Sequence, residues 1–224
     1  MIQHLRQAVE KNLELRVKYP DEPLKFMDSE IELDESIKAL EILSTEPQFL
    51  TRLLDHDIVP ALTELLVHEN LDIAMETVHL VSELVDSDTL VDAGGESVEN
   101  EEVEAAKGFV ESLYTNGFFS TLLTLLPRME ENADESYGKC VYDALSIFEN
   151  LFDADPKHAG RILEARVQIV EFLLQRILYN TDSTKSIALH NPPPNTCELD
   201  TATFPVNRHY ASELLFTICQ YGGE

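Results

Sequence analysis

Residues Ile58–Asp86 read IVPALTELLVHENLDIAMETVHLVSELVD and are predicted to form two helices, each apolar on one face. The first is short and ends in Leu-Leu, and in the longer second helix apolar residues recur every three or four positions. Phe118–Asp153 repeats this order with a different sequence. The apolar positions are Ile58, Leu62, Leu65, Leu66, Ala74, Val78, Val81, Leu84 and Val85 in one copy, and Phe118, Leu122, Leu125, Leu126, Val141, Leu145, Phe148, Leu151 and Phe152 in the other.

Repeated helix pairs of this kind predict an all-α fold, an armadillo/HEAT-type right-handed superhelix in which each unit buries its apolar stripe against its neighbours. A looser third copy runs through Val167–Ile177 and Tyr210–Cys219. We expect an N-terminal helical capping region at residues 1–54 and repeats at residues 55–224, with a long loop or insertion at about 180–207. No polar terminal cap follows Gln220, so we expect an array truncated at its C-terminus.

Capping residues predict where the helices begin and end. Ser29 with Glu32 has the spacing of a capping box, and Asn116-Gly117 offers a residue for the left-handed conformation at a helix end. The other expected N-caps are Thr45, Asp57, Asn70 and Asp155.

The chain is strongly acidic, with 42 Asp and Glu residues against 16 Lys and Arg residues in 224, a formal net charge of −26. Such a surface repels nucleic acid and anionic membranes, so we expect no direct nucleic-acid partner and no membrane partner. The charge is uneven, because Leu53–Ala106 contains fifteen acidic residues and no Lys or Arg. This stretch favours a basic partner.

Motifs for catalysis are missing from the sequence, which has no Gly-rich phosphate loop, no Gly-x-Ser-x-Gly and no His-Glu-x-x-His. We therefore expect a protein that is not an enzyme and that needs no cofactor. His56, His68 and His79 fall on separate predicted elements, which favours surface or groove histidines over metal ligands. The three cysteines are widely spaced and predict neither a disulfide framework nor a zinc site.

A candidate peptide-binding ladder appears when the two long helices are aligned on Leu84-Val85-Asp86 and Leu151-Phe152-Asp153. Residues seven apart share a helix side, so equivalent polar residues would recur on successive units. An extended basic peptide could pair its cations with the carboxylates and its backbone with Asn150. The alternative is that these residues are solvated acids on a helix back. The aligned pairs are Glu76 with Asp143, Glu83 with Asn150, and Asp86 with Asp153.

The segment NLELRVKYPDEPLKFMDSE, residues 12–30, closely resembles the pre-repeat signature of the beta-catenin-like protein 1 family. The resemblance continues through SELVDSD (82–88), IFEN (147–150) and YASELL (210–215), and so covers essentially the whole chain. Glu83, Asp86, Glu149 and Asn150 match the family pattern on the long helices.

The resemblance implies a nuclear armadillo-repeat protein that is associated with the spliceosome through the nineteen complex and acts as a scaffold. Its implied partners are basic, localisation-signal-like segments of splicing factors. Family members continue for several repeats beyond the position of Gln220, in agreement with a truncated array. The chain has no Trp, so the Trp ladder with which armadillo import receptors bind lysine is not available to it.

Two other functions remain open from the sequence. One is a structural module that forms a homodimer or larger homo-oligomer through its apolar ends or its acidic face. The other is a cytoplasmic armadillo adaptor with cytoskeletal or adhesion partners.

Overall fold

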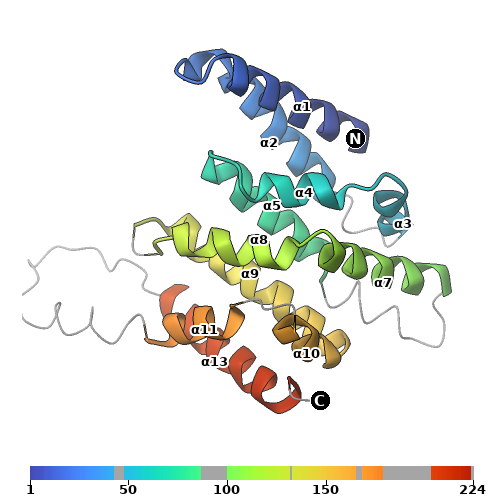
Figure 1. Ribbon diagram of the computed structural model, residues 1–224, viewed down its shortest axis with the longest axis vertical. Helices are drawn as coiled ribbons and strands as arrows, with labels where there is room; N and C mark the ends of the chain where they lie inside the picture. Colours follow the sequence, from blue (N-terminus) through green and yellow to red (C-terminus); the bar gives the residue numbers. More distant parts are fainter. Residues whose placement is uncertain (43–47, 87–99, 132, 165–167, 179–202, 223–224) are drawn as a thin grey trace, which may run out of the picture. The chain divides into compact units, whose positions relative to one another are not determined.

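The computed structural model describes residues 1–42, 48–86, 100–131, 133–164, 168–178 and 203–222 (Figure 1). These residues form two compact units, Met1–Leu125 and Leu126–Glu224. Within the described ranges the regular structure consists of α-helices and short 3-10 turns, without strands. The all-α, armadillo-type fold is therefore confirmed.

The first unit is built on helix pairs (Figure 1). Helix α1 packs on α2, α2 on α5, and α3 on α7, while α4 contacts α5, α7 and α8. Helices α1 and α2 lie side by side at the blue end of the ribbon. The elements are α1 (Ile2–Lys18), η1 (Pro23–Lys25), α2 (Met27–Glu41), α3 (Gln48–Asp55), α4 (Val59–Leu65), α5 (Leu71–Leu84), α7 (Asn100–Thr115) and α8 (Phe118–Leu125).

The second unit is assembled around its last helix, α13, which packs against α9, α10 and α11. Helix α9 is the longest, and its apolar face is fully buried at Leu145, Phe148 and Leu151. The elements of this unit are η3 (Leu126–Arg128), α9 (Glu135–Ala154), α10 (Lys157–Glu164), α11 (Ile169–Leu178) and α13 (Thr203–Tyr221).

The predicted apolar positions of both repeats lie in the core. All of those in Ile58–Asp86 and in Phe118–Asp153 are buried. Helix α5 is buried over most of its surface and is exposed at Asp72 and Glu83. Helices of a repeat array bury their apolar residues against neighbouring helices in this way.

Three of the predicted caps are confirmed. The Asn70 side chain accepts a hydrogen bond of 3.0 Å from the Asp72 N–H at the start of α5, and Asp155 accepts one of 3.0 Å from the Lys157 N–H. Gly117 has a φ of 70°, the left-handed conformation between α7 and α8.

Two predicted caps are wrong. Ser29 lies inside α2, where its hydroxyl donates to the Phe26 carbonyl at 2.6 Å, so it does not open the helix. Asp57 has a φ of 47°, and the Asp57 and Ile58 N–H groups donate to Leu54 and Leu53. These bonds form a Schellman motif that ends α3, and the Asp57 side chain does not cap α4.

The predicted loop at 180–207 is wrong at its end, because residues 203–207 form the beginning of α13. Its remaining residues, 180–202, lie outside the described residues, as does the predicted cap Thr45. The boundary predicted at residue 54 separates a capping region from the repeats. It is a different kind of boundary from the one between the two compact units, and it stays a prediction.

Candidate peptide-binding surface

Helix α5 carries the acidic side chains predicted for the first unit. Glu83 is exposed near the C-terminal end of the helix, and Asp86 is exposed directly after it. Glu76 lies two turns before Glu83 on the same side and is half-buried. The helix C-terminus carries partial negative charge, which adds to that of the carboxylates. This end of α5 therefore attracts cations.

Glu76 already faces a cation within its own unit. Burial raises the pKa of the Glu76 carboxyl, and the charge of Lys38 on α2 opposes that rise. Lys38 is held by Asp34 at 2.8 Å, a bond that raises the pKa of the lysine. The charge of Glu76, the acidic residue nearest α2, is therefore partly neutralised. Glu83 and Asp86 are the more exposed of the three carboxylates.

The predicted residues of the second unit lie at different depths on α9. Asp153 is exposed, and Glu149 is half-buried and accepts a hydrogen bond from the Tyr210 hydroxyl of α13. Asp143 and Asn150 are both buried, at 8% and 9% exposure, and lie about a third of a turn around the helix from Glu149. A buried group contacts a peptide only if its neighbours move aside. The role of Asp143 and Asn150 in peptide binding stays a prediction.

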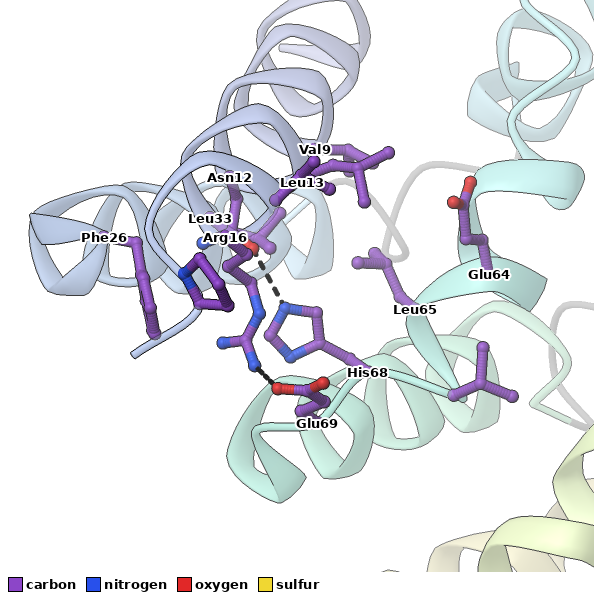
Figure 2. Close-up of a pocket in the computed structure, with 13 residues that line it drawn as sticks. Val9, Asn12, Leu13, Arg16, Phe26, Leu33, Glu64, Leu65, His68 and Glu69 are labelled. Carbon is purple, nitrogen blue, oxygen red and sulfur yellow. Dashed lines mark hydrogen bonds and ion pairs between the residues drawn. The ribbon is translucent and has the colours of Figure 1, made fainter. Parts of the chain in front are cut away.

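A cavity of about 330 Å³ lies elsewhere in the first unit, between α1 and the turn that joins α4 to α5 (Figure 2). Val9 and Leu13 of α1 line one side, and Leu65 lines another. Arg16 points across the opening and forms ion pairs with Glu69 and with Glu30 of α2. The Arg16 guanidinium also lies 4.6 Å from the centre of the Phe26 ring.

His68 stands at this cavity as one member of a hydrogen-bond chain across three segments (Figure 2). Its Nδ1 accepts from the Asn70 N–H at 3.1 Å, and its Nε2 donates to the Asn12 side-chain oxygen at 3.0 Å. The Asn12 amide donates to the Ser29 hydroxyl at 3.0 Å, and Ser29 donates to Phe26. With Nδ1 as the acceptor the imidazole is neutral, and the Asn70 carbonyl, 3.3 Å from the same nitrogen, could accept from Nδ1 of a protonated ring.

The stability of the first unit should fall in acid through His68. Burial, the largest cause, lowers the pKa of His68 below its ordinary 6.5. The unfolded chain therefore binds the proton more readily, and this part of the stability is lost as the pH falls from about 6.5 towards the folded pKa. Thermal denaturation between neutral pH and pH 5 should show a smaller loss for His68→Gln than for the wild type. The control His209→Gln, at an exposed position, should behave as the wild type, and equal pH dependence in all three proteins would contradict the role of His68.

The described histidines are not grouped as metal ligands. Among the residues that the structure describes, no group of three or more His, Cys, Asp or Glu side chains is placed to hold a metal ion. His68 belongs to the chain described above, and His79 lies 3.3 Å from Glu41. In the same described ranges, no helix combines the length and the apolar content that a membrane span needs.

Several interacting residues were not predicted from the sequence. Tyr142 precedes Glu149 by seven residues and Asp153 by eleven, and this helical spacing is a signal that could have placed it beside them. The contact between Asn12 and His68 joins residues 56 positions apart, and no local pattern reports it.

Comparison with known proteins agrees with the helical fold. The family described as catenin-beta-like, Arm-motif containing nuclear matches residues 1–223. The chain belongs to this family. Beta-catenin-like protein 1 of Homo sapiens is 32% identical over 167 residues, which are 75% of this chain and 28% of the human protein. The Beta-catenin-like protein 1 homolog of Schizosaccharomyces pombe is 32% identical over 177 residues, 79% of this chain and 29% of the yeast protein.

Membership in the catenin-beta-like family gives the chain an armadillo architecture, and the family itself is described as nuclear. The resemblance seen in the sequence is thereby confirmed. The chain spans less than a third of the length of the curated relatives that it matches.

Proposed function

We propose that this protein is a non-catalytic scaffold of the pre-mRNA splicing machinery, associated with the nineteen complex, which binds basic, localisation-signal-like segments of splicing factors. The observation that carries the proposal is the exposed pair Glu83 and Asp86 at the C-terminal end of α5, inside a stretch without Lys or Arg. Asp153 and Glu149 on α9 offer further carboxylates. The net charge of −26 supports a cationic partner, because it steers cations towards the protein from a distance.

Glu83 and Asp86 are suited to this role because each lies in water. In the described part of the first unit the Glu83 side chain has no ion-pair partner, so a bound Lys or Arg would not have to displace one. Exposed charge pairs are each worth about 0.2–1 kcal/mol, so the affinity must come from several of them acting together. An extended peptide with several cations meets that requirement.

Charge reversal at these two positions tests the proposal. Glu83→Lys with Asp86→Lys should weaken the binding of a short fluorescent peptide rich in Lys and Arg by about tenfold. Each reversal removes one attraction and adds one repulsion. Together the two reversals should cost about 1.4 kcal/mol of binding free energy, which corresponds to a tenfold loss of affinity. Fluorescence anisotropy measures the affinity. Added salt should also weaken binding by the wild type, because salt shortens the distance over which exposed charges attract, which is about 10 Å at 0.1 M ionic strength.

A matched control separates the site from the net charge. Glu10→Lys with Glu14→Lys changes the charge by the same amount on exposed positions of α1, and it should leave the affinity within about twofold of the wild type. Equal losses in both double variants would show that the peptide responds only to overall charge. Wild-type affinity in the Glu83 and Asp86 variant, or an affinity independent of salt, would remove α5 from the site.

Homo-oligomerisation is a second candidate, favoured by apolar side chains exposed near the cavity of the first unit. Leu13 is 52% exposed and Val17 is 74% exposed, one helical turn apart on α1. Light scattering should give the mass of a dimer if a second copy covers this surface, and Val17→Glu should then return the mass to that of a monomer. A monomeric mass for the wild type would exclude this candidate.

A further inference from the structure

Two tyrosines of the second unit, Tyr142 on α9 and Tyr210 on α13, lie against each other. Their ring centres are 5.3 Å apart and their planes are inclined by 53°. Tyr210 is buried at 8% exposure, whereas Tyr142 keeps 41% of its surface exposed. Tyr142 is therefore held by its neighbour on one side and presents aromatic surface to the solvent on another.

Two carboxylates lie on the same side of α9 as Tyr142. Glu149 follows it by seven residues and Asp153 by eleven, which places the three side chains on one stripe of the helix. Tyr210 connects them, because its hydroxyl donates to Glu149. Burial is the largest cause that raises the pKa of Tyr210, and Glu149, Tyr142 and Asp153 raise it further. Tyr210 therefore remains a protonated donor.

The stripe lacks a cation of its own. In the described part of the second unit neither Glu149 nor Asp153 forms an ion pair, although Lys139 is exposed one turn before Tyr142. An aromatic ring attracts a cation placed over its face within about 6 Å, and neighbouring carboxylates attract the same cation. The combination of an exposed ring with two carboxylates is therefore complementary to a Lys or Arg side chain and not to an apolar one.

We propose that Tyr142 and Glu149 form a seat for one cationic side chain of a bound basic segment, with the cation over the Tyr142 ring and near the Glu149 carboxylate. Asp153 lies about 16 Å from Tyr142 along the same stripe and adds a longer-range attraction. Tyr210 is the positioning residue, because it supports the Tyr142 ring and holds the Glu149 carboxylate. Arg fits this seat better than Lys, since its planar guanidinium stacks on a ring and bonds a carboxylate at the same time. This inference rests on the proposed function, and it names side chains that the predicted acidic ladder did not include.

Removing the ring should weaken binding, whereas removing its hydroxyl should not. We expect Tyr142→Leu to bind a short fluorescent Arg-rich peptide about two- to fivefold more weakly than the wild type, as expected for the loss of a solvent-exposed cation–π contact. Tyr142→Phe keeps the aromatic face and should stay close to the wild type. Tyr137→Leu is the matched control, because Tyr137 lies on the same helix but on a different side from Tyr142, and it should not change the affinity.

A second pair of measurements tests the charge. In a matched peptide, citrulline replaces each Arg and removes the cation while keeping the planar shape. Asp153→Asn, at an exposed position, should weaken binding of the Arg peptide and leave binding of the citrulline peptide unchanged. This variant also provides a test that does not depend on Tyr142→Leu remaining folded, which circular dichroism checks for every variant.

The outcomes separate the seat from the function on which it rests. If the wild type binds the Arg peptide but Tyr142→Leu binds it equally well, the seat is overturned and the proposed function stands. A loss in Tyr142→Phe as large as in Tyr142→Leu would assign the contact to the hydroxyl and overturn the ring's role. If the wild type binds the Arg and citrulline peptides alike, cation recognition fails, and the proposed function fails with it.

Discussion

Glu131→Ala should lower the free energy of unfolding of the second unit by about 3–5 kcal/mol, because it removes a buried carboxylate that is paired with a buried arginine. Glu131 and Arg176 are 3% and 10% exposed, and the Arg176 Nη1 lies 2.5 Å from the Glu131 carboxylate. The second Glu131 oxygen accepts from the Asn207 amide at 2.8 Å. Helices α11 and α13 are thus joined to the segment before α9 through one side chain.

The cost is large because Glu131 and Arg176 are both buried, so bulk water cannot readily take the place of the carboxylate. Burial raises the pKa of Glu131, while Arg176 and Asn207 oppose that rise by favouring the carboxylate. Arg176 also donates to the Leu126 and Met129 carbonyls, at 3.3 and 3.5 Å. Neither carbonyl carries the full negative charge needed to balance it.

Urea denaturation followed by circular dichroism measures this loss. Glu130→Ala is the control, since Glu130 is the exposed neighbour in sequence, and it should change the stability by less than about 0.5 kcal/mol. Replacing both charges, Glu131→Met with Arg176→Met, should recover most of the loss, because a buried pair is costly mainly when only one partner is removed. A single-variant loss no larger than that of the control would contradict this account.

Phe148→Ala should destabilise the second unit to a similar extent, by about 3–5 kcal/mol. Phe148 is fully buried on α9, with its ring centre 6.5 Å from that of Phe152. The substitution removes apolar surface from the core and leaves a cavity that the surrounding helices fill only in part, and both effects lower the free energy of unfolding.

The same chemical change at an exposed site gives the comparison. Phe216 on α13 is 70% exposed, and Phe216→Ala should change the midpoint of urea denaturation only slightly, by less than about 0.5 kcal/mol in stability. Equal losses at the two positions would mean that α9 is not packed as the structure has it.

The helices and their buried stripes were predictable because their signals are local. Leu62 and Val78 are buried as their spacing indicates, and Asn70 and Gly117 mark helix ends where they were expected. The failures at Ser29 and Asp57 are tertiary or multi-residue effects. Ser29 lies inside α2 and accepts a hydrogen bond from Asn12 on another helix, and Asp57 adopts a left-handed conformation within a Schellman motif.

The candidate site was predictable only in part. The sequence marked α5 and α9 as acidic, and Glu83, Asp86 and Asp153 are exposed. It did not indicate that Asp143 and Asn150 would be buried, since exposure depends on which helices pack against α9. Those neighbours, α10 and α13, come from later in the chain.

The sequence by itself determined that this protein is acidic and built from amphipathic helices, since composition and apolar spacing can be read directly along the chain. Only the tertiary structure decided which polar groups meet, such as Asn12 with His68 and Tyr142 with Tyr210. These partners are far apart in the sequence, and their contact depends on how helices pack, which no local period specifies.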